Sequence, residues 1–307
     1  MGTNYSVIVY APDSQRLTLE TGIQRTLNRV VSSMSVYEPR SDVTRVNEAP
    51  LDEWVEVSAE VVHVVSLGLK VAELSNGMFE PTILPLVNLW GFGPQGRAEE
   101  VPSDEELESA LARVGWRDIE VRDDPPAIRR RADRELDLAG IAKGYGADAV
   151  AEYLLGRGHT QFLIELGGDM NIQGGKPDGT LWRVAIEKPD ETQRGIYRIL
   201  EFEDAALVTS GDYRNYFEVD GVRYSHTIDP RTGRPVDHRL ASVSVIAENA
   251  TLADAWSTAL MAMGTEAAKE LAEREELSVL LIVRTDNGFE EYAFGEFVRL
   301  LAEEDAR

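Results

Sequence analysis

The most informative stretch of the sequence reads Leu136-Asp137-Leu138-Ala139-Gly140-Ile141-Ala142-Lys143-Gly144-Tyr145-Gly146. A strand over residues 135–138 is expected to deliver Asp137 into a glycine turn, and a helix is expected to begin at once. Free N–H groups at a helix start attract anions, and Lys143 adds a positive charge one turn further on. The stretch therefore suits a phosphate, and it is equally compatible with a plain strand-to-helix corner in which Lys143 is solvated.

Apolar spacing along the rest of the chain indicates a mixture of helices and strands. Helices are predicted over residues 14–34, 58–74, 103–115, 141–155, 251–263 and 266–273. Strands are predicted over residues 5–10, 119–121, 127–131, 135–138, 161–166, 182–187, 198–203, 216–219, 240–246, 278–283 and 290–294. Residues 35–50 and 78–96 are expected to form loops, the second of them packed and functional.

The order of these elements favours an α+β fold with mixed or antiparallel sheets and packed helices. A doubly wound sheet is disfavoured because helices and strands do not alternate regularly. The chain of 307 residues contains no repeat or clear linker. We therefore expect one domain over residues 1–307, or two closely packed subdomains with the site between them.

Composition excludes several classes of function. The formal net charge of −23 would repel nucleic acid, so no nucleic-acid partner is expected. The absence of cysteine excludes disulfides, thiolate catalysis and cysteine-ligated metals. With only four histidines, a metal is expected on carboxylate and carbonyl oxygens. No apolar run approaches the roughly 20 residues that a membrane span needs.

Familiar catalytic and nucleotide-binding motifs are absent from the sequence. It contains neither the Gly-x-x-x-x-Gly-Lys-Ser/Thr loop nor the Gly-x-Gly-x-x-Gly fingerprint, so a P-loop or Rossmann site is unsupported. It also lacks Gly-x-Ser-x-Gly and His-Glu-x-x-His, which disfavours common hydrolases and zinc proteases.

A second candidate site lies on the helix predicted over residues 251–263. Asp254, Ser257 and Thr258 have the spacing i, i+3 and i+4, so they share one helical face among Ala, Leu and Met residues. Oxygen atoms in apolar surroundings need partners, and a hard cation would satisfy them. The alternative is a buried helix whose aspartate pairs with an arginine.

A third candidate region combines residues 209–214 with residues 224–235, where small, polar and turn-forming residues accompany several arginines. His226 is the histidine in this setting, and a histidine among Ser, Asp and Arg can act as an acid–base group. Asp212 and Asp229 are rival candidates in the same region.

Taken together, these segments resemble the ApbE family, the magnesium-dependent FAD:protein FMN transferases. The matching stretches occur in order over nearly the whole chain. They are Met1-Gly-Thr, Ser35-Val-Tyr37-Glu-Pro-Arg-Ser41, Gly77-Met-Phe-Glu80-Pro-Thr, Pro85-Leu-Val-Asn-Leu-Trp90-Gly-Phe, residues 137–146, Leu166-Gly-Gly-Asp169, residues 209–213, residues 224–235 and Ala253-Asp254-Ala-Trp-Ser-Thr258.

The resemblance implies an ApbE-like, T-fold-related architecture and an enzyme that binds FAD in a cleft and cuts its pyrophosphate with Mg²⁺. The FMN phosphoryl group would pass to a Thr or Ser hydroxyl of an acceptor flavoprotein, and AMP would leave. The implied metal ligands are Gly140, through its carbonyl oxygen, Asp254 and Thr258, with Ser257 beside them where some members carry Asp. The implied FAD contacts are Met1, Tyr37, Met78, Phe79, Glu80, Asp137, Lys143 and Ile228.

Three functions remain open at this point. Flavin transfer leads, followed by an FAD pyrophosphatase that gives FMN and AMP, and by a non-catalytic FAD-binding protein. His226 is the candidate group for activating the acceptor hydroxyl. Two locations also remain open: the extracytoplasmic side of the cell membrane if a leader was removed, and otherwise the cytoplasm.

Overall fold

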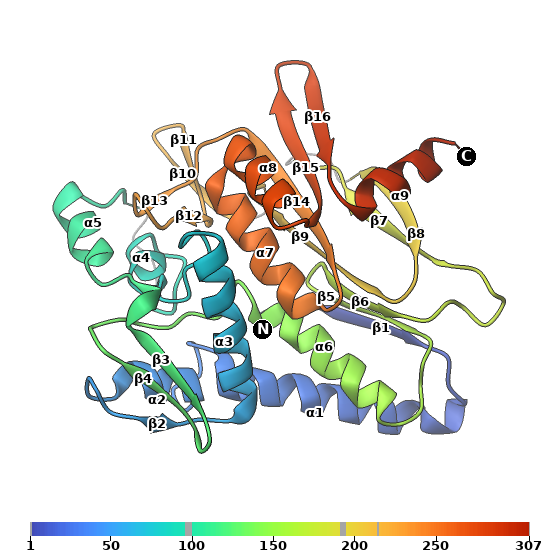
Figure 1. The fold of residues 1–307 in the computed structure, drawn as a ribbon, viewed down its shortest axis with the longest axis horizontal. Coiled ribbons are helices and arrows are strands. Elements are labelled where there is room, and N and C mark those ends of the chain that lie inside the picture. Colours follow the sequence, from blue (N-terminus) through green and yellow to red (C-terminus); the bar gives the residue numbers. More distant parts are fainter. Residues whose placement is uncertain (1, 96–99, 191–194, 214, 307) are drawn as a thin grey trace.

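The computed structural model describes residues 2–95, 100–190, 195–213 and 215–306. Within them, a seven-stranded sheet follows the spatial order β1-β5-β6-β9-β14-β15-β16, with every neighbouring pair antiparallel (Figure 1). The bounds of its strands are β1 (Tyr5–Val9), β5 (Phe162–Leu166), β6 (Asp169–Gln173), β9 (Ala205–Gly211), β14 (Leu240–Ala247), β15 (Ser278–Thr285) and β16 (Gly288–Ala293).

Alternate residues of this sheet enter different cores, as the two-residue period of a strand requires. Ile164 and Val208 pack into the larger core with α6 (Ala142–Leu155) and α7 (Ala250–Met263). Their neighbours Leu163 and Leu207 pack into a second core with strands β7 (Trp182–Glu187) and β8 (Ile196–Phe202) and helix α9 (Glu296–Asp305). The sheet is therefore covered on both faces.

Helix α7 is the central helix of the larger core. It contacts α6, β9 and β14, and it also contacts α3 (Ala59–Leu74) and α8 (Thr265–Arg274). Most of its residues are buried, which is typical of a helix enclosed on several sides. The long helix α1 (Arg16–Met34), preceded by the short helix η1 (Asp13–Gln15), packs on α6.

Gly144 allows α6 and α7 to approach closely. A Cβ atom at this position would lie 2.1 Å from the carbonyl oxygen of Ala250 and 2.9 Å from the Cβ of Asp254. We therefore expect Gly144→Ala to lower the free energy of unfolding by about 1–3 kcal/mol, measured by urea denaturation. Gly22→Ala on α1 is the matched control because its Cβ would meet only the outer end of the Tyr153 ring, which can turn away. Equal losses in the two variants would contradict this account of the helix crossing.

In Figure 1 most of the remaining elements lie on the side of α3 that faces away from the seven-stranded sheet, and others lie beside the end of α7. A three-stranded sheet has the order β2-β4-β3, and two short hairpins pair β10 with β11 and β12 with β13. A third core joins α4 and α5 to the hairpins, and the Trp90 indole donates to the carbonyl oxygen of Gly233 at 2.7 Å. The bounds are α2 (Asp42–Glu48), β2 (Val55–Glu56), α4 (Leu84–Leu89), α5 (Asp104–Leu111), η2 (Trp116–Asp118), β3 (Ile119–Asp123), β4 (Pro126–Arg130), β10 (Tyr216–Val219), β11 (Val222–Ser225), β12 (Ile228–Asp229) and β13 (Arg234–Pro235).

The structure confirms the α+β class and corrects several local predictions. The expected loop over residues 35–50 contains α2, whose first turn is capped by the Ser41 hydroxyl accepting from the Thr44 N–H at 3.0 Å. The expected loop over residues 78–96 contains α4 in its described part. The expected strand over residues 135–138 is reduced to one bridge, between Glu135 and Ile83. Strands β6 and β9 and helix α9 were not predicted.

None of the helices in the described ranges has the length and apolar character that crossing a bilayer requires. The expectation of one domain, or of two closely packed subdomains, stays a prediction.

Candidate functional site

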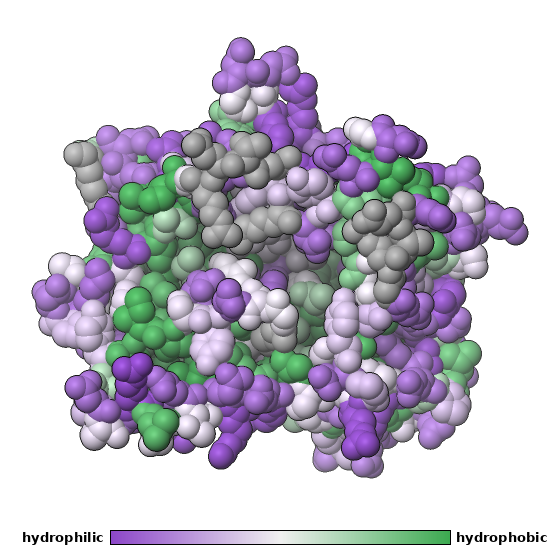
Figure 2. Space-filling view, turned by 180° about the vertical axis from the view of Figure 1, so that it is seen from behind, coloured by the Kyte–Doolittle hydropathy of each residue, from purple (hydrophilic) through white to green (hydrophobic). Residues whose placement is uncertain are grey.

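A cleft of about 1210 Å³ brings together the separate segments singled out in the sequence. Helix α7 contributes Asp254, Thr258, Met261 and Ala262, whose spacing of four, three and one residues places them on one helical face. The start of α6, the end of β9 and much of the segment 78–94 also line the cleft. Figure 2 shows a hollow near the centre of the face opposite to that in Figure 1, bordered by both polar and apolar residues.

Most of the site residues expected from the sequence line this cleft. Its volume exceeds the roughly 300–1,000 Å³ of pockets for drug-sized ligands, so it has room for an extended ligand. The expected residues that line it are Tyr37, Met78, Phe79, Glu80, Asp137, Gly140, Lys143, His226, Ile228, Asp254 and Thr258. Met1, also expected here, lies outside the described residues.

Lys143 lies between two buried carboxylates. Its Nζ is 2.9 Å from Oδ2 of Asp169 and 3.2 Å from Oδ1 of Asp254, and each aspartate is only 1% exposed. Burial by itself lowers the pKa of Lys143, but the attraction of the two carboxylates outweighs it and raises the pKa above the usual value. Lys143 is therefore a fixed cation with 34% of its side chain still accessible, and not the solvated side chain of the alternative interpretation.

The carboxylate of Asp254 is further held by helix α6. The N–H of Gly144 donates to its Oδ2 at 3.0 Å, so the start of α6 and the middle of α7 are joined at this group. The partner of Asp254 is thus a lysine and a backbone N–H, not the arginine that the sequence left open.

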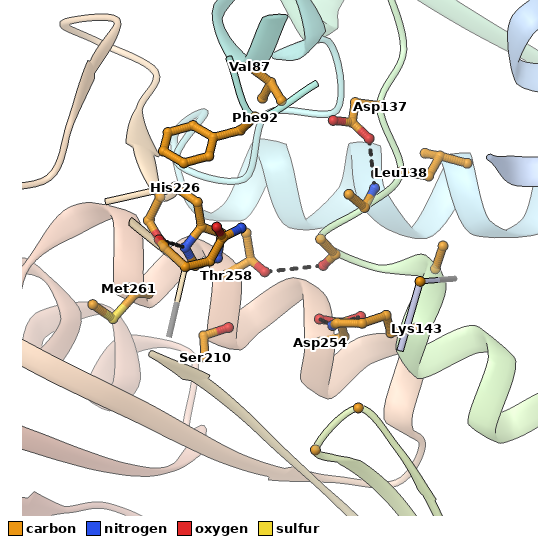
Figure 3. A pocket seen from close by; sticks show the side chains of 18 of the residues that line it. Val87, Phe92, Asp137, Leu138, Lys143, Ser210, His226, Asp254, Thr258 and Met261 are labelled. Atoms are coloured by element: carbon orange, nitrogen blue, oxygen red, sulfur yellow. Dashed lines mark hydrogen bonds and ion pairs between the residues drawn. The ribbon is translucent and has the colours of Figure 1, made fainter. Parts of the chain in front are cut away.

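Thr258 and Gly140 place two more oxygens near the start of α6. The hydroxyl of Thr258 donates to the carbonyl oxygen of Gly140 at 3.2 Å, and a Cβ at Gly140 would lie only 3.0 Å from the Thr258 methyl group. In Figure 3 Thr258 lies between His226 on one side and Asp254 with Lys143 on the other. One carboxylate, one carbonyl and one hydroxyl make a set of oxygen donors that suits a hard cation.

Ser257 faces a different partner from its neighbour Thr258. Its Oγ lies 2.9 Å from Oγ of Ser210 and donates to the backbone carbonyl of Asp254 at 3.0 Å, and the side chain is fully buried. It is not among the described residues that line the cleft.

Over the described ranges, no group of three or more His, Asp or Glu side chains could hold a metal. A cation at this site would therefore depend on the carbonyl and hydroxyl oxygens.

His226 has one ring nitrogen fixed by the backbone. Its Nδ1 lies 3.0 Å from the carbonyl oxygen of Asn215, which can only accept, so Nδ1 carries the proton and Nε2 is the basic nitrogen of the neutral ring. The side chain is accessible within the cleft, yet it is surrounded closely enough for desolvation to lower its pKa. The positive charge of Lys143 lowers this pKa further, against the hydrogen bond to Asn215.

Asp212 and Asp229, the two rivals of His226, lie outside the described lining of the cleft. The carboxylate of Asp212 accepts two hydrogen bonds from Arg284, at 2.7 and 2.8 Å. Asp229 is paired with Arg231 at 2.7 Å and also accepts from its backbone N–H. Each of these two carboxylates is therefore held by one arginine through at least two hydrogen bonds.

Asp137, Glu80 and Tyr37 line another part of the cleft. Oδ1 of Asp137 accepts from the N–H of Ala139 at 2.9 Å, and burial raises the pKa of Asp137. Burial likewise raises the pKa of Glu80, whose carboxylate accepts from the backbone N–H and the hydroxyl of Thr82. The Tyr37 hydroxyl donates to the backbone carbonyl of residue 92 at 3.0 Å, and the Tyr37 ring is largely exposed.

Two contributors to the site were given no role from the sequence. Asp169 belongs to the matching stretch Leu166-Gly-Gly-Asp169, just beyond the strand predicted over residues 161–166, and it is the first residue of β6. A carboxylate directly after two glycines was the available signal. The backbone carbonyl of Asn215, which sets the tautomer of His226, left no signal in the sequence.

Comparison with known proteins places this geometry in a family. The ApbE family model matches residues 1–281. The FAD:protein FMN transferase of Vibrio cholerae serotype O1 is 42% identical over 304 residues, which cover 98% of this chain and 91% of that protein. The protein of the same name from Escherichia coli K12 is 35% identical over 309 residues, covering 99% of this chain and 88% of that one.

Solved structures agree with the sequence comparison. The flavin transferase ApbE from Vibrio cholerae superposes with a TM-score of 0.90 at 40% identity, covering 98% of this chain and 96% of that one. The ApbE protein from Thermotoga maritima superposes with a TM-score of 0.87 at 32% identity, covering 97% and 96%. These matches confirm the resemblance seen in the motifs, and the chain belongs to the ApbE family.

Proposed function

We propose that this protein transfers the FMN part of FAD onto a Thr or Ser hydroxyl of an acceptor flavoprotein, with Mg²⁺, and releases AMP. The names of the relatives support flavin transfer from FAD to a protein. One observation supports the magnesium part of the proposal: the buried Asp254, the Thr258 hydroxyl and the Gly140 carbonyl to which it donates line one cleft, which has room for an extended ligand.

FAD would lie along the cleft, with its pyrophosphate near the start of α6. There the ammonium of Lys143 and the N-terminus of α6 can donate to phosphate oxygens, and bound Mg²⁺ would offset the negative charge that Asp169 and Asp254 add. Buried apolar side chains from the segment 78–94 and from β12 offer surface for the rings of the dinucleotide. The proposed FAD contacts are Met1, Tyr37, Met78, Phe79, Glu80, Asp137, Lys143 and Ile228.

The donors proposed for Mg²⁺ are Asp254, the Gly140 carbonyl and Thr258. Mg²⁺ usually takes one or two carboxylates and keeps several waters, so this small donor set fits it. Ser257, which the family resemblance placed beside the metal, is bonded to Ser210, and we assign it the role of fixing α7 against β9. When bound, Mg²⁺ would neutralise negative charge on the pyrophosphate and stabilise the leaving AMP.

His226 is the group that we assign to the acceptor hydroxyl. With its Nδ1–H held by Asn215, the free Nε2 can take the hydroxyl proton. The hydroxyl oxygen then forms a bond to the phosphorus of the FMN half. The bond from that phosphorus to the bridging oxygen breaks, and AMP leaves with that oxygen. Asp212 and Asp229 remain rival candidates, but their pairing with arginines and their positions outside the described lining favour His226.

Nucleotide products separate this proposal from its two alternatives. The protein is incubated with FAD and Mg²⁺, with and without an acceptor domain carrying Thr or Ser, and the nucleotides are separated by chromatography. Transfer predicts AMP that forms with the acceptor present, without an equal amount of free FMN. Equal amounts of AMP and FMN in both samples would show an FAD pyrophosphatase, and unchanged FAD would show binding alone.

A further inference from the structure

The cluster of Asp169, Lys143 and Asp254 contains one more carboxylate than its single ammonium can neutralise. The three side chains come from β6, α6 and α7, and both aspartates are 1% exposed. Asp254 lines the cleft, whereas Asp169 is not among the described residues that line it. One carboxylate of the cluster is therefore open to a ligand, and the other lies behind Lys143.

The two carboxylates differ in what else they contact. Asp254 also accepts from the Gly144 N–H, and it shares a helical face with Thr258, whose hydroxyl bonds to Gly140. Asp169 receives its hydrogen bond from Lys143, directly after two glycines with φ values of 63° and 103°. Residues other than glycine rarely adopt such positive φ angles, so the two glycines allow the turn that positions the Asp169 carboxylate.

The difference matters if Asp254 binds a cation. An Asp254 carboxylate that turns towards a divalent ion gives up part of its contact with Lys143. Even a partly buried ammonium loses stability when it is left without a counterion. Asp169 offers a second counterion, because its carboxylate lies 2.9 Å from Nζ and Asp169 is not among the described residues that line the cleft.

We propose that Asp169 is a positioning residue that holds Lys143 in place and charge-balanced, so that Asp254 can exchange its ammonium partner for Mg²⁺. The inference rests on the proposed function and extends it to a residue that touches neither FAD nor the acceptor. Asp169 acts through Lys143, and its removal should weaken the metal site in particular.

The test measures binding of Mg²⁺ alone, without FAD. Thermal unfolding of the wild type and of Asp169→Asn is followed as the Mg²⁺ concentration is raised. The quantity compared is the Mg²⁺ concentration that raises Tm by one fixed increment, set for all variants as half of the rise of the wild type at the highest concentration tested, and called the half-rise concentration. The amide keeps the shape of the side chain and removes its charge. We expect the half-rise concentration to increase about tenfold or more, as is typical when a group supporting a metal ligand is lost.

Asp148→Asn is the matched control. Asp148 links the same three elements, because it accepts from Asn171 on β6 and from Thr251 and the N–H of Ala250 on α7. Its loss should lower Tm without changing the half-rise concentration for Mg²⁺. Equal shifts of that concentration in both variants would reduce Asp169 to a structural contact and overturn the proposal.

A second pair of variants tests whether Asp169 acts through Lys143, and it serves also if Asp169→Asn does not fold. Lys143→Gln and the double variant Lys143→Gln/Asp169→Asn should have nearly the same half-rise concentration, because the group that Asp169 positions is gone. A tenfold difference between them would overturn the proposal.

If Mg²⁺ does not raise Tm even in the wild type, the magnesium part of the proposed function fails, and the role of Asp169 fails with it. A normal wild-type response with an unaltered Asp169→Asn response removes the role of Asp169 alone.

Discussion

Replacing Asp254 with asparagine should reduce the rate of flavin transfer by about 10²–10³-fold. Its carboxylate is the one acidic group in the donor set with Gly140 and Thr258, and it is almost fully buried. The amide preserves the volume and one oxygen but removes the negative charge that would hold Mg²⁺. Because Asp169 still neutralises Lys143, the variant does not leave that ammonium without a partner. Initial rates at saturating FAD, over a range of Mg²⁺ concentrations, measure the effect.

Two comparisons make this result specific to the charge. Asp254→Ala should lose at least as much activity, and its unfolding curve separates lost function from lost structure. Asp148→Asn alters the cap of the same helix α7 without touching the cleft lining, and it should retain most of the activity at a temperature where it is folded. Full activity in Asp254→Asn would refute the assignment of the metal site.

Replacing His226 with glutamine should lower the transfer rate by about 10²–10⁴-fold and remove its dependence on pH in the acid range. The neutral ring is the active form because Nε2 must accept the hydroxyl proton. Desolvation lowers the pKa of His226 below the ordinary value of about 6.5, so the wild type should stay active at pH 6.5. Its rate should fall only as the pH drops through this lowered pKa, where the ring becomes protonated.

His63→Gln is the control for that substitution. His63 lies exposed on α3, near the ring of Tyr145, and is not among the described residues that line the cleft. Its variant should keep both the rate and the acid limb of the pH profile. If His226→Gln kept the same acid limb as the wild type, another group would be the base, and Asp212→Asn and Asp229→Asn would be measured next.

The parts of the site that depend on the regular spacing of residues along one helix could be predicted from the sequence. The four-residue spacing of Asp254 and Thr258 correctly placed both on one face of a helix, α7. The position of Lys143 after the glycine turn correctly placed it in the first turn of another helix, α6. The long helices could be predicted for the same reason, and their observed bounds differ from the expected ones by one or two residues. Periodicity averages over many residues, so long elements give the clearest signal.

Contacts between distant segments could not be predicted in this way. Nothing local to Lys143 indicates that Asp169, 26 residues away, would share it with Asp254. The same applies to Asp212: its neighbours Ser, Gly and Tyr suggested a catalytic setting, whereas Arg284, 72 residues away, binds its carboxylate. Partners of this kind are set by tertiary packing, which a single sequence does not specify.

Short elements were the other source of error. Helices α2 and α4 have seven and six residues, too few for a helical period to stand out among Ser, Pro, Asp and Asn. The predicted strand over residues 135–138 has alternating apolar residues, but a single bridge to Ile83 is its only strand-like pairing in the described part of the chain. There Asn47 supplies partners instead, because its amide bonds both the N–H and the carbonyl of Leu136.

The intact mass of an acceptor domain tests the central claim most directly. The domain, carrying one accessible Thr or Ser, is incubated with this protein and FAD, either with Mg²⁺ or with a chelator in its place. The account predicts that the acceptor gains the mass of one FMN less one water with Mg²⁺, and stays unchanged with the chelator. An unchanged mass in both samples, or an equal gain in both, would contradict it.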